Sequence, residues 1–108
     1  MPNVIEIDAK TAKDWVDAGQ VVLVDVREDQ ELAAASITGA VHVPMSKFDP
    51  ELVPTGDDGK KVVFFCAHGM RSYQVADYLL QNQMLGEAYS MTGGIVAWAG
   101  AGLPYEQG

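Results

Sequence analysis

The sequence predicts an α/β fold in which helices cover both faces of a central, mainly parallel sheet. Two observations lead to this prediction. Residues 21–26 and 61–65 are short, nearly continuous apolar runs, which is typical of strands buried on both faces. Segments with apolar residues at helical spacing lie between such runs, and this alternation is the order of βαβ units. The chain has 108 residues, so we expect a single domain over residues 1–108.

The expected strands and helices alternate along the chain. The strands are residues 4–7, 21–26, 40–43, 61–65 and 88–91, and the helices are residues 9–18, 28–35, 72–83 and 95–99. Asp8 is expected to cap the first helix and Gly19 to end it. Residues 45–60 are rich in proline and glycine and are expected to form an irregular connection, with the acidic pair Asp57–Asp58 in a solvated turn.

Composition and charge exclude several classes of function. The formal net charge is −8, and a phosphate backbone needs a basic face, so nucleic acid is not an expected partner. No stretch approaches the roughly 18 apolar residues of a membrane span, and residues 1–7 do not resemble a secretion signal. The single cysteine allows no disulfide within the chain and suits a reducing compartment, so we expect a cytoplasmic location.

The segment from Cys66 to Arg71, Cys-Ala-His-Gly-Met-Arg, is the richest in chemistry. Cys66 follows a predicted strand at the end where sites form in parallel sheets, and it faces the amino end of the next helix. Unpaired N–H groups and the helix dipole favour an anion there, which lowers a thiol pKa. Gly69 permits backbone angles that other residues avoid, and the planar guanidinium of Arg71 can hold an oxyanion. We therefore predict a reactive thiol in an anion cradle, rather than an inert buried cysteine.

Four motifs extend this pattern over nearly the whole chain. They are Val24-Asp-Val-Arg-Glu28, Ile37-Thr-Gly-Ala-Val-His-Val-Pro44, Cys66-x-x-Gly-x-Arg-Ser72, and Thr92-Gly-Gly-Ile-x-x-Trp98 followed by Gly102-Leu-Pro104. With these motifs in this order, the sequence resembles the rhodanese family. Family members often carry Gly-His-Ile where this chain has Ala35-Ser36-Ile37, a difference that affects a structural contact and not the chemistry.

The resemblance implies a three-layer rhodanese-like domain and a sulfurtransferase that works through a persulfide. A small anionic donor such as thiosulfate would give its outer sulfur to Cys66, and cyanide, a small thiol or a protein thiol would accept it. Arg71 would bind the donor. The backbone amides of the loop would hold the terminal sulfur, and the residues concerned are Ala67, His68, Gly69, Met70 and Ser72. Such a reaction needs no metal or organic cofactor, and the charge and apolar pattern already argue against nucleic acid and a membrane as partners.

Other polar residues are open to two interpretations each. His68 could act as a general base beside Cys66, but a solvent-exposed loop histidine is favoured, because loop amides and a helix dipole make a thiolate without a base. His42 lies in a predicted strand and is expected to be packed or hydrogen-bonded. Asp25 and Arg27 end a buried strand, where we expect a structural ion pair that fixes nearby loops, with support of the active-site residues as the alternative.

Three other functions compete with thiosulfate sulfurtransfer. Cysteine phosphatases and arsenate reductases resemble one another in placing five residues between cysteine and arginine. The loop here has four, residues 67–70, which makes a tighter ring of amides suited to one sulfur atom. Rhodanese-like domains that act only as binding modules usually lack the cysteine. A dedicated sulfur relay to a protein acceptor stays open, with thiosulfate then only a convenient donor.

Overall fold

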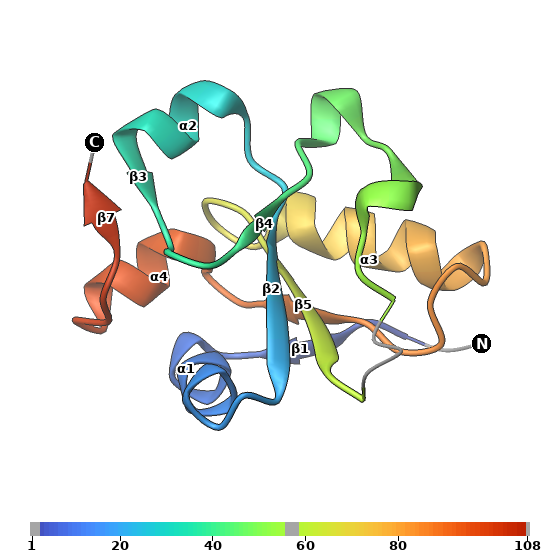
Figure 1. Cartoon of the computed structure of the whole chain (residues 1–108), viewed down its shortest axis with the longest axis horizontal. Coiled ribbons are helices and arrows are strands. Elements are labelled where there is room, and N and C mark those ends of the chain that lie inside the picture. The colour runs from blue at the N-terminus through green and yellow to red at the C-terminus, as the bar shows by residue number, and fades with distance from the viewer. Residues whose placement is uncertain (1–2, 56–58, 108) are drawn as a thin grey trace.

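The computed structural model describes residues 3–55 and 59–107, and its central sheet has five strands in the order β1-β6-β5-β2-β4 (Figure 1). These strands are β1 Ile5–Ile7, β2 Val21–Asp25, β4 Val41–His42, β5 Lys61–Phe65 and β6 Tyr89–Met91. All four neighbouring pairs are parallel, which confirms the predicted sheet. The turn expected at Asp57–Asp58 lies outside the described residues.

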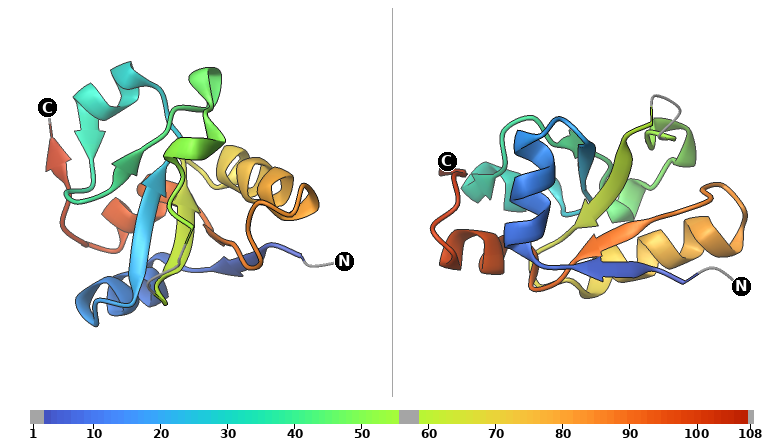
Figure 2. Two further views of the ribbon diagram at one scale, coloured as in Figure 1. Left: turned by 45° about the vertical axis from the view of Figure 1, so that its right-hand side comes forward. Right: turned by 90° about the horizontal axis from the view of Figure 1, so that it is seen from below.

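Helices cover both faces of the sheet, so the predicted three layers are confirmed. The helices are α1 Ala9–Asp17, α2 Asp29–Ala34, α3 Met70–Gln81 and α4 Gly94–Gly100, and the 3-10 turns are η1 Met45–Lys47 and η2 Pro50–Leu52. Helices α1 and α4 pack on one face and α3 on the other (Figures 1 and 2). Asp8 caps α1 by accepting a hydrogen bond from the Thr11 amide at 2.8 Å, as expected.

Alternation along β5 divides the core into two halves. Successive side chains of a strand point to opposite faces, so Phe64 joins the core half under α3 while Phe65 joins the half under α1 and α4. Both phenylalanines are fully buried. Trp98 is buried in the second half and donates its indole N–H to the Pro104 carbonyl at 2.8 Å. Burial on both sides is what the apolar run of β5 predicts.

The structure differs from the predicted elements at several places, of which two concern the start of α3 and the residues after α2. Elsewhere, β4 is shorter than the predicted strand 40–43, and η1 and η2 lie in the segment expected to be irregular. Helix α3 begins at Met70 rather than at residue 72, because Gly69 adopts a left-handed conformation (φ 102°) that starts the helix earlier. Ala35, expected at the end of a helix, instead begins β3 Ala35–Ser36, which pairs antiparallel with β7 Glu106–Gln107. The first difference matters for function, because it places Arg71 in the first turn of α3.

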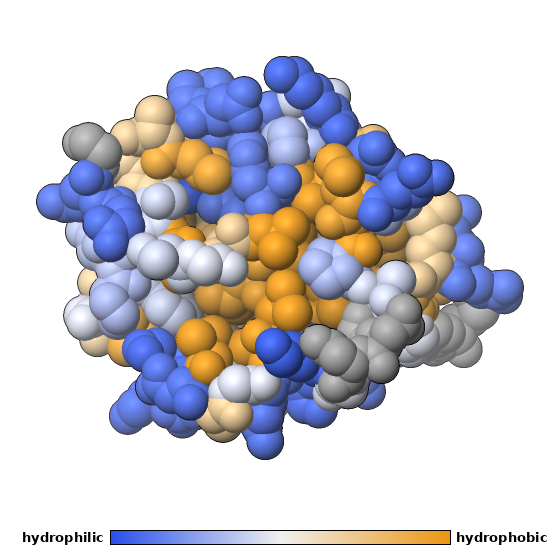
Figure 3. Space-filling model, in the orientation of Figure 1, coloured by the Kyte–Doolittle hydropathy of each residue, from blue (hydrophilic) through white to orange (hydrophobic). Residues whose placement is uncertain are grey.

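The described surface mixes apolar and charged areas. In Figure 3, apolar residues occupy the middle of the face viewed in Figure 1, and hydrophilic residues surround them. Partly buried apolar side chains of β2, β4 and η1 pack against the core: Val22, Val41 and Met45. Within residues 3–55 and 59–107, none of the helices has the length and apolar character needed to traverse a bilayer.

Candidate functional site

The sheet register places Cys66 at the carboxyl edge of the two central strands. Asp25, the last residue of β2, lies beside Phe65, the last residue of β5. The next residue of the first strand, Val26, donates its amide to the Phe65 carbonyl at 3.0 Å. The residues that follow both strands therefore meet at one edge, which is where parallel sheets form their sites. Cys66 follows β5 at this edge, just before the loop that leads into α3.

The thiol of Cys66 lies in a cradle of backbone amides. The Gly69 amide donates to Sγ at 3.1 Å and the Ser72 amide at 3.4 Å. The Ser72 hydroxyl lies 3.6 Å from the same sulfur. Cys66 itself is 1% exposed, so water contributes little to these interactions. The loop thus presents several hydrogen-bond donors to a single sulfur atom.

The cradle stabilises the thiolate. Burial raises the pKa of Cys66, but hydrogen bonds from the Ser72 amide and hydroxyl and from the Gly69 and His68 amides outweigh it, so the net pKa is lower than that of an ordinary thiol. The thiolate is the nucleophilic form of cysteine. The predicted direction of the pKa shift therefore agrees with the geometry.

Helix α4 fixes the Cys66 loop from the side opposite α3. The Ile95 amide donates to the Cys66 carbonyl at 2.9 Å, and the Val96 amide donates to the Ala67 carbonyl at 3.2 Å. Gly94 lies so close that an added Cβ would be 2.2 Å from the Cys66 carbonyl oxygen. Gly93 and Gly94 belong to the motif Thr92-Gly-Gly-Ile-x-x-Trp98, but this contact with the loop was not predicted. The adjacent glycines were the available signal.

Arg71 is paired with a carboxylate that sequence analysis did not select. Its Nη1 donates to Glu31 Oε1 at 2.7 Å and its Nη2 to Glu31 Oε2 at 2.9 Å, a bidentate contact. This pair holds the pKa of Glu31 down at about 2 and raises the pKa of Arg71. The two residues are 40 positions apart, so no local pattern reveals the pair.

Asp25 and Arg27 form the expected structural ion pair. Arg27 Nη2 donates to Asp25 Oδ2 at 2.9 Å, and both side chains are almost fully buried. Arg27 also donates to the Ala35 carbonyl at 2.7 Å and to the Glu31 carbonyl at 3.3 Å. The pair therefore ties α2 to the end of β2, and through Glu31 it supports the position of Arg71.

The other predicted residues occupy different positions around the loop. His68 is exposed, and in the described residues no hydrogen bond joins its ring to Cys66. Met70 is 75% exposed at the start of α3, whereas Ala67 is half-buried. His42 is half-buried, and its Nε2 lies 2.7 Å from the Arg27 carbonyl oxygen, a hydrogen-bonded position as expected.

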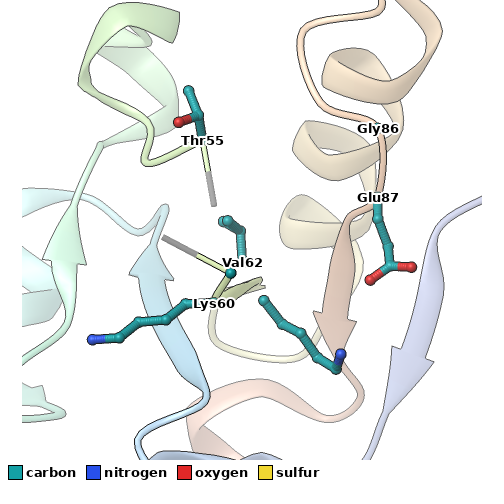
Figure 4. Close-up of a pocket in the computed structure, with 7 residues that line it drawn as sticks. Thr55, Lys60, Val62, Gly86 and Glu87 are labelled. Atoms are coloured by element: carbon teal, nitrogen blue, oxygen red, sulfur yellow. The ribbon is translucent and has the colours of Figure 1, made fainter. Parts of the chain in front are cut away.

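Two hollows lie away from the thiol. A polar cavity of about 360 Å³ is at the amino ends of β5 and β6, opposite Cys66, and Figure 4 shows Lys60, Val62 and Glu87 around it. A more apolar hollow of about 230 Å³ lies between η1 and α3 and is lined by Met45, Phe48, Gln74, Val75 and Tyr78. Neither is lined by Cys66, whose sulfur is held by the loop itself.

Comparison with known proteins supports this description. The rhodanese-like domain family matches residues 8–101. A putative sulfurtransferase, YtwF, of Bacillus subtilis is 38% identical over 100 residues, covering 92% of this chain and 94% of YtwF. The thiosulfate sulfurtransferase GlpE of Vibrio cholerae is 32% identical and covers 98% of both chains. A crystal structure from Staphylococcus saprophyticus is 33% identical with a TM-score of 0.77, covering 94% of this chain and 99% of the other. This chain therefore belongs to the rhodanese family of sulfurtransferases.

Proposed function

We propose that this sulfurtransferase moves a sulfane sulfur from thiosulfate, or a donor like it, through a persulfide on Cys66 to a thiophilic acceptor. The observation that carries the proposal is the set of amides on one buried sulfur, with the Gly69 amide at 3.1 Å and the Ser72 amide at 3.4 Å from Sγ. Such donors stabilise an anionic sulfur without a metal or a base. A lone cysteine also avoids internal disulfides, which supports a cytoplasmic location.

In the first half-reaction, the Cys66 thiolate attacks the outer sulfur of thiosulfate. A bond forms between Sγ and that sulfur, the sulfur–sulfur bond of thiosulfate breaks, and its electron pair leaves with sulfite. The protein now carries a persulfide anion and no external oxidant or reductant is consumed. The loop amides from Ala67 to Ser72 hold the terminal sulfur, and Arg71 orients the anionic donor.

In the second half-reaction, an acceptor attacks the terminal sulfur. With cyanide, a carbon–sulfur bond forms, the persulfide bond breaks, and its electron pair returns to Cys66 as the thiolate. A small or protein thiolate takes the sulfur in the same way and becomes a persulfide. Division of one transfer into two steps through an enzyme nucleophile is ordinary covalent catalysis.

Thiosulfate-to-cyanide transfer tests the proposal, with thiocyanate as the measured product. Wild type should form thiocyanate and Cys66→Ser should form none above background. Because the cradle suits one sulfur atom, wild type should not hydrolyse an aryl phosphate. Transfer that survives in Cys66→Ser, or Cys66-dependent phosphatase activity without sulfur transfer, would overturn the proposal.

A further inference from the structure

We propose that Glu31 sets the charge of the sulfur donor that this site accepts: by occupying the fork of Arg71, it disfavours dianionic donors and favours donors with less negative charge. The proposal rests on the sulfurtransfer proposed above and names a class of substrate for it. Glu31 is a positioning residue here, since it acts through Arg71 and does not contact Cys66.

The contacts of Glu31 neutralise the cation at the site. Both carboxylate oxygens bind Arg71, at 2.7 and 2.9 Å. A guanidinium has five N–H donors, so Arg71 keeps others with which to orient a donor. Its positive charge, however, is already balanced by a carboxylate in contact with it. A donor that enters therefore finds hydrogen-bond donors but no net positive charge from this pair.

The remaining groups at the site make it negative. Glu28 lies next to the pair, where its charge acts on both Glu31 and Arg71. Its carboxylate accepts hydrogen bonds from the Ser46 amide at 3.1 Å and from the Ser46 hydroxyl. Cys66 adds a third negative charge in its reactive form. Arg27 also acts on Glu31, but its charge is balanced by Asp25. Glu28, Glu31, Arg71 and the Cys66 thiolate together therefore leave the site negative, within a chain whose net charge is −8.

Thiosulfate brings two negative charges to this site, whereas a thiosulfonate or a persulfide of a zwitterionic thiol brings one. Like charges in partly exposed sites repel each other, and the repulsion grows with the product of the charges. The penalty from Glu31 is consequently larger for thiosulfate. The side chains of Arg71 and Glu31 are 33% and 28% exposed, so an approaching donor can meet the pair.

Glu31→Gln is a sharp test because it changes charge with little change in shape. Glu31 Oε1 also accepts the Glu28 amide at 3.0 Å at the start of α2, and a glutamine oxygen can keep that bond. Asp17→Asn is the matched control. It removes one negative charge from an exposed i,i+4 ion pair with Lys13 at the end of α1, near the amino end of β2 and away from Cys66.

The experiment measures the rate of Cys66 persulfide formation with thiosulfate and with methanethiosulfonate, a monoanion that also transfers its outer sulfur and releases a sulfinate. For each donor, the rate with the variant is divided by the rate with wild type, and this ratio removes the effect of the donor's intrinsic reactivity. Glu31→Gln should raise the thiosulfate rate about fivefold more than the methanethiosulfonate rate, as one interaction between unit charges at a partly exposed site predicts. Asp17→Asn should change both rates equally.

Salt provides a second measurement that needs no variant. Added salt screens exposed charges, so it should speed wild type with thiosulfate relative to methanethiosulfonate, and this effect should shrink in Glu31→Gln. If persulfide forms but the ratio of variant rate to wild-type rate is the same for both donors, the role proposed for Glu31 is wrong and the proposed function is unaffected. Absence of Cys66 persulfide with both donors in wild type would instead overturn the proposed function on which that role rests.

Discussion

Ser72 contacts the reactive sulfur through two of its own groups. Its amide lies 3.4 Å and its hydroxyl 3.6 Å from Cys66 Sγ, and the hydroxyl also contacts Ser90 Oγ at 2.8 Å. A cradle of loop amides was expected from the position of Cys66 before a helix, and the family resemblance implied that the Ser72 amide is part of it. The sequence could not predict the contacts of the hydroxyl, since they include the Gly69 carbonyl at 3.2 Å and Ser90, which lies in β6 and 18 positions away in the chain.

Substitution Ser72→Ala should raise the pKa of Cys66, because it removes a donor to the thiolate and leaves the amide in place. At neutral pH, iodoacetamide should then alkylate Cys66 about tenfold more slowly, the lower end of the effect of one hydrogen bond to a charged group. The pH dependence of alkylation measures both quantities. Ser90→Ala removes the other hydroxyl of the same buried pair without touching Sγ, so it should alter alkylation little. Equal effects of the two variants would contradict the role given to the Ser72 hydroxyl.

Local sequence patterns predicted most elements and left out the long-range contacts between them. The apolar runs of β2 and β5 and the cap of α1 follow from adjacent residues. The pairing of β3 with β7 does not, because these strands have two residues each and lie about 70 positions apart in the chain. The bond between Arg71 and Glu31 was missed for the same reason, since it joins α3 to α2. Helix α4 was predicted, but its close approach to the Cys66 loop was not.

This close approach makes Gly94 essential for the packing of α4 against the Cys66 loop. Its φ is +56°, and an added Cβ would lie 2.5 Å from the Ala67 carbonyl carbon. Gly94→Ala should therefore lower the free energy of unfolding for two reasons. A left-handed alanine is strained, and overpacking against the loop should cost roughly 2 kcal/mol in addition to that strain. Sulfur transfer should fall as well, because the loop carbonyls bound by Ile95 and Val96 must shift. Urea denaturation and thiocyanate formation measure the two effects.

Gly19→Ala is the matched control for this substitution. Gly19 has a φ of +71°, but nothing lies within 4 Å of its added Cβ. The substitution should cost about 1–2 kcal/mol of strain and leave transfer unchanged. Equal losses of stability in the two variants would show that the contact between α4 and the loop is unimportant.

Across the whole molecule, a chain of charged contacts connects the sheet to the site. It runs from Asp25 in β2 through Arg27 to the backbone of Glu31, and from the Glu31 side chain to Arg71 in α3. Three elements that are separate in sequence are thereby held at one edge of the sheet. The Asp25–Arg27 part of this chain is buried, and the Glu31–Arg71 part is partly exposed.

The pKa of Glu31 predicts how this connection depends on pH. Its folded value of about 2 is below its ordinary value of 4.5, so the ionised form stabilises the folded state. That stabilisation is complete above pH 4.5 and is lost as the pH falls towards about 2. Because the pair is partly exposed, Glu31→Gln should lose about 1 kcal/mol at pH 7. The difference in free energy of unfolding between Glu31→Gln and wild type should nearly vanish as the pH approaches about 2. Urea denaturation at pH 7 and at this acid pH measures it. A difference that persists unchanged there would contradict the assignment.

The central claim is that Cys66 carries the transferred sulfur, and the intact mass of the protein tests it most directly. Wild type treated with thiosulfate or methanethiosulfonate should gain the mass of one sulfur atom, and cyanide should remove that mass with formation of thiocyanate. Cys66→Ser should gain nothing under the same conditions. A wild-type protein that gains no sulfur from either donor, or a Cys66→Ser protein that gains it, would contradict the account.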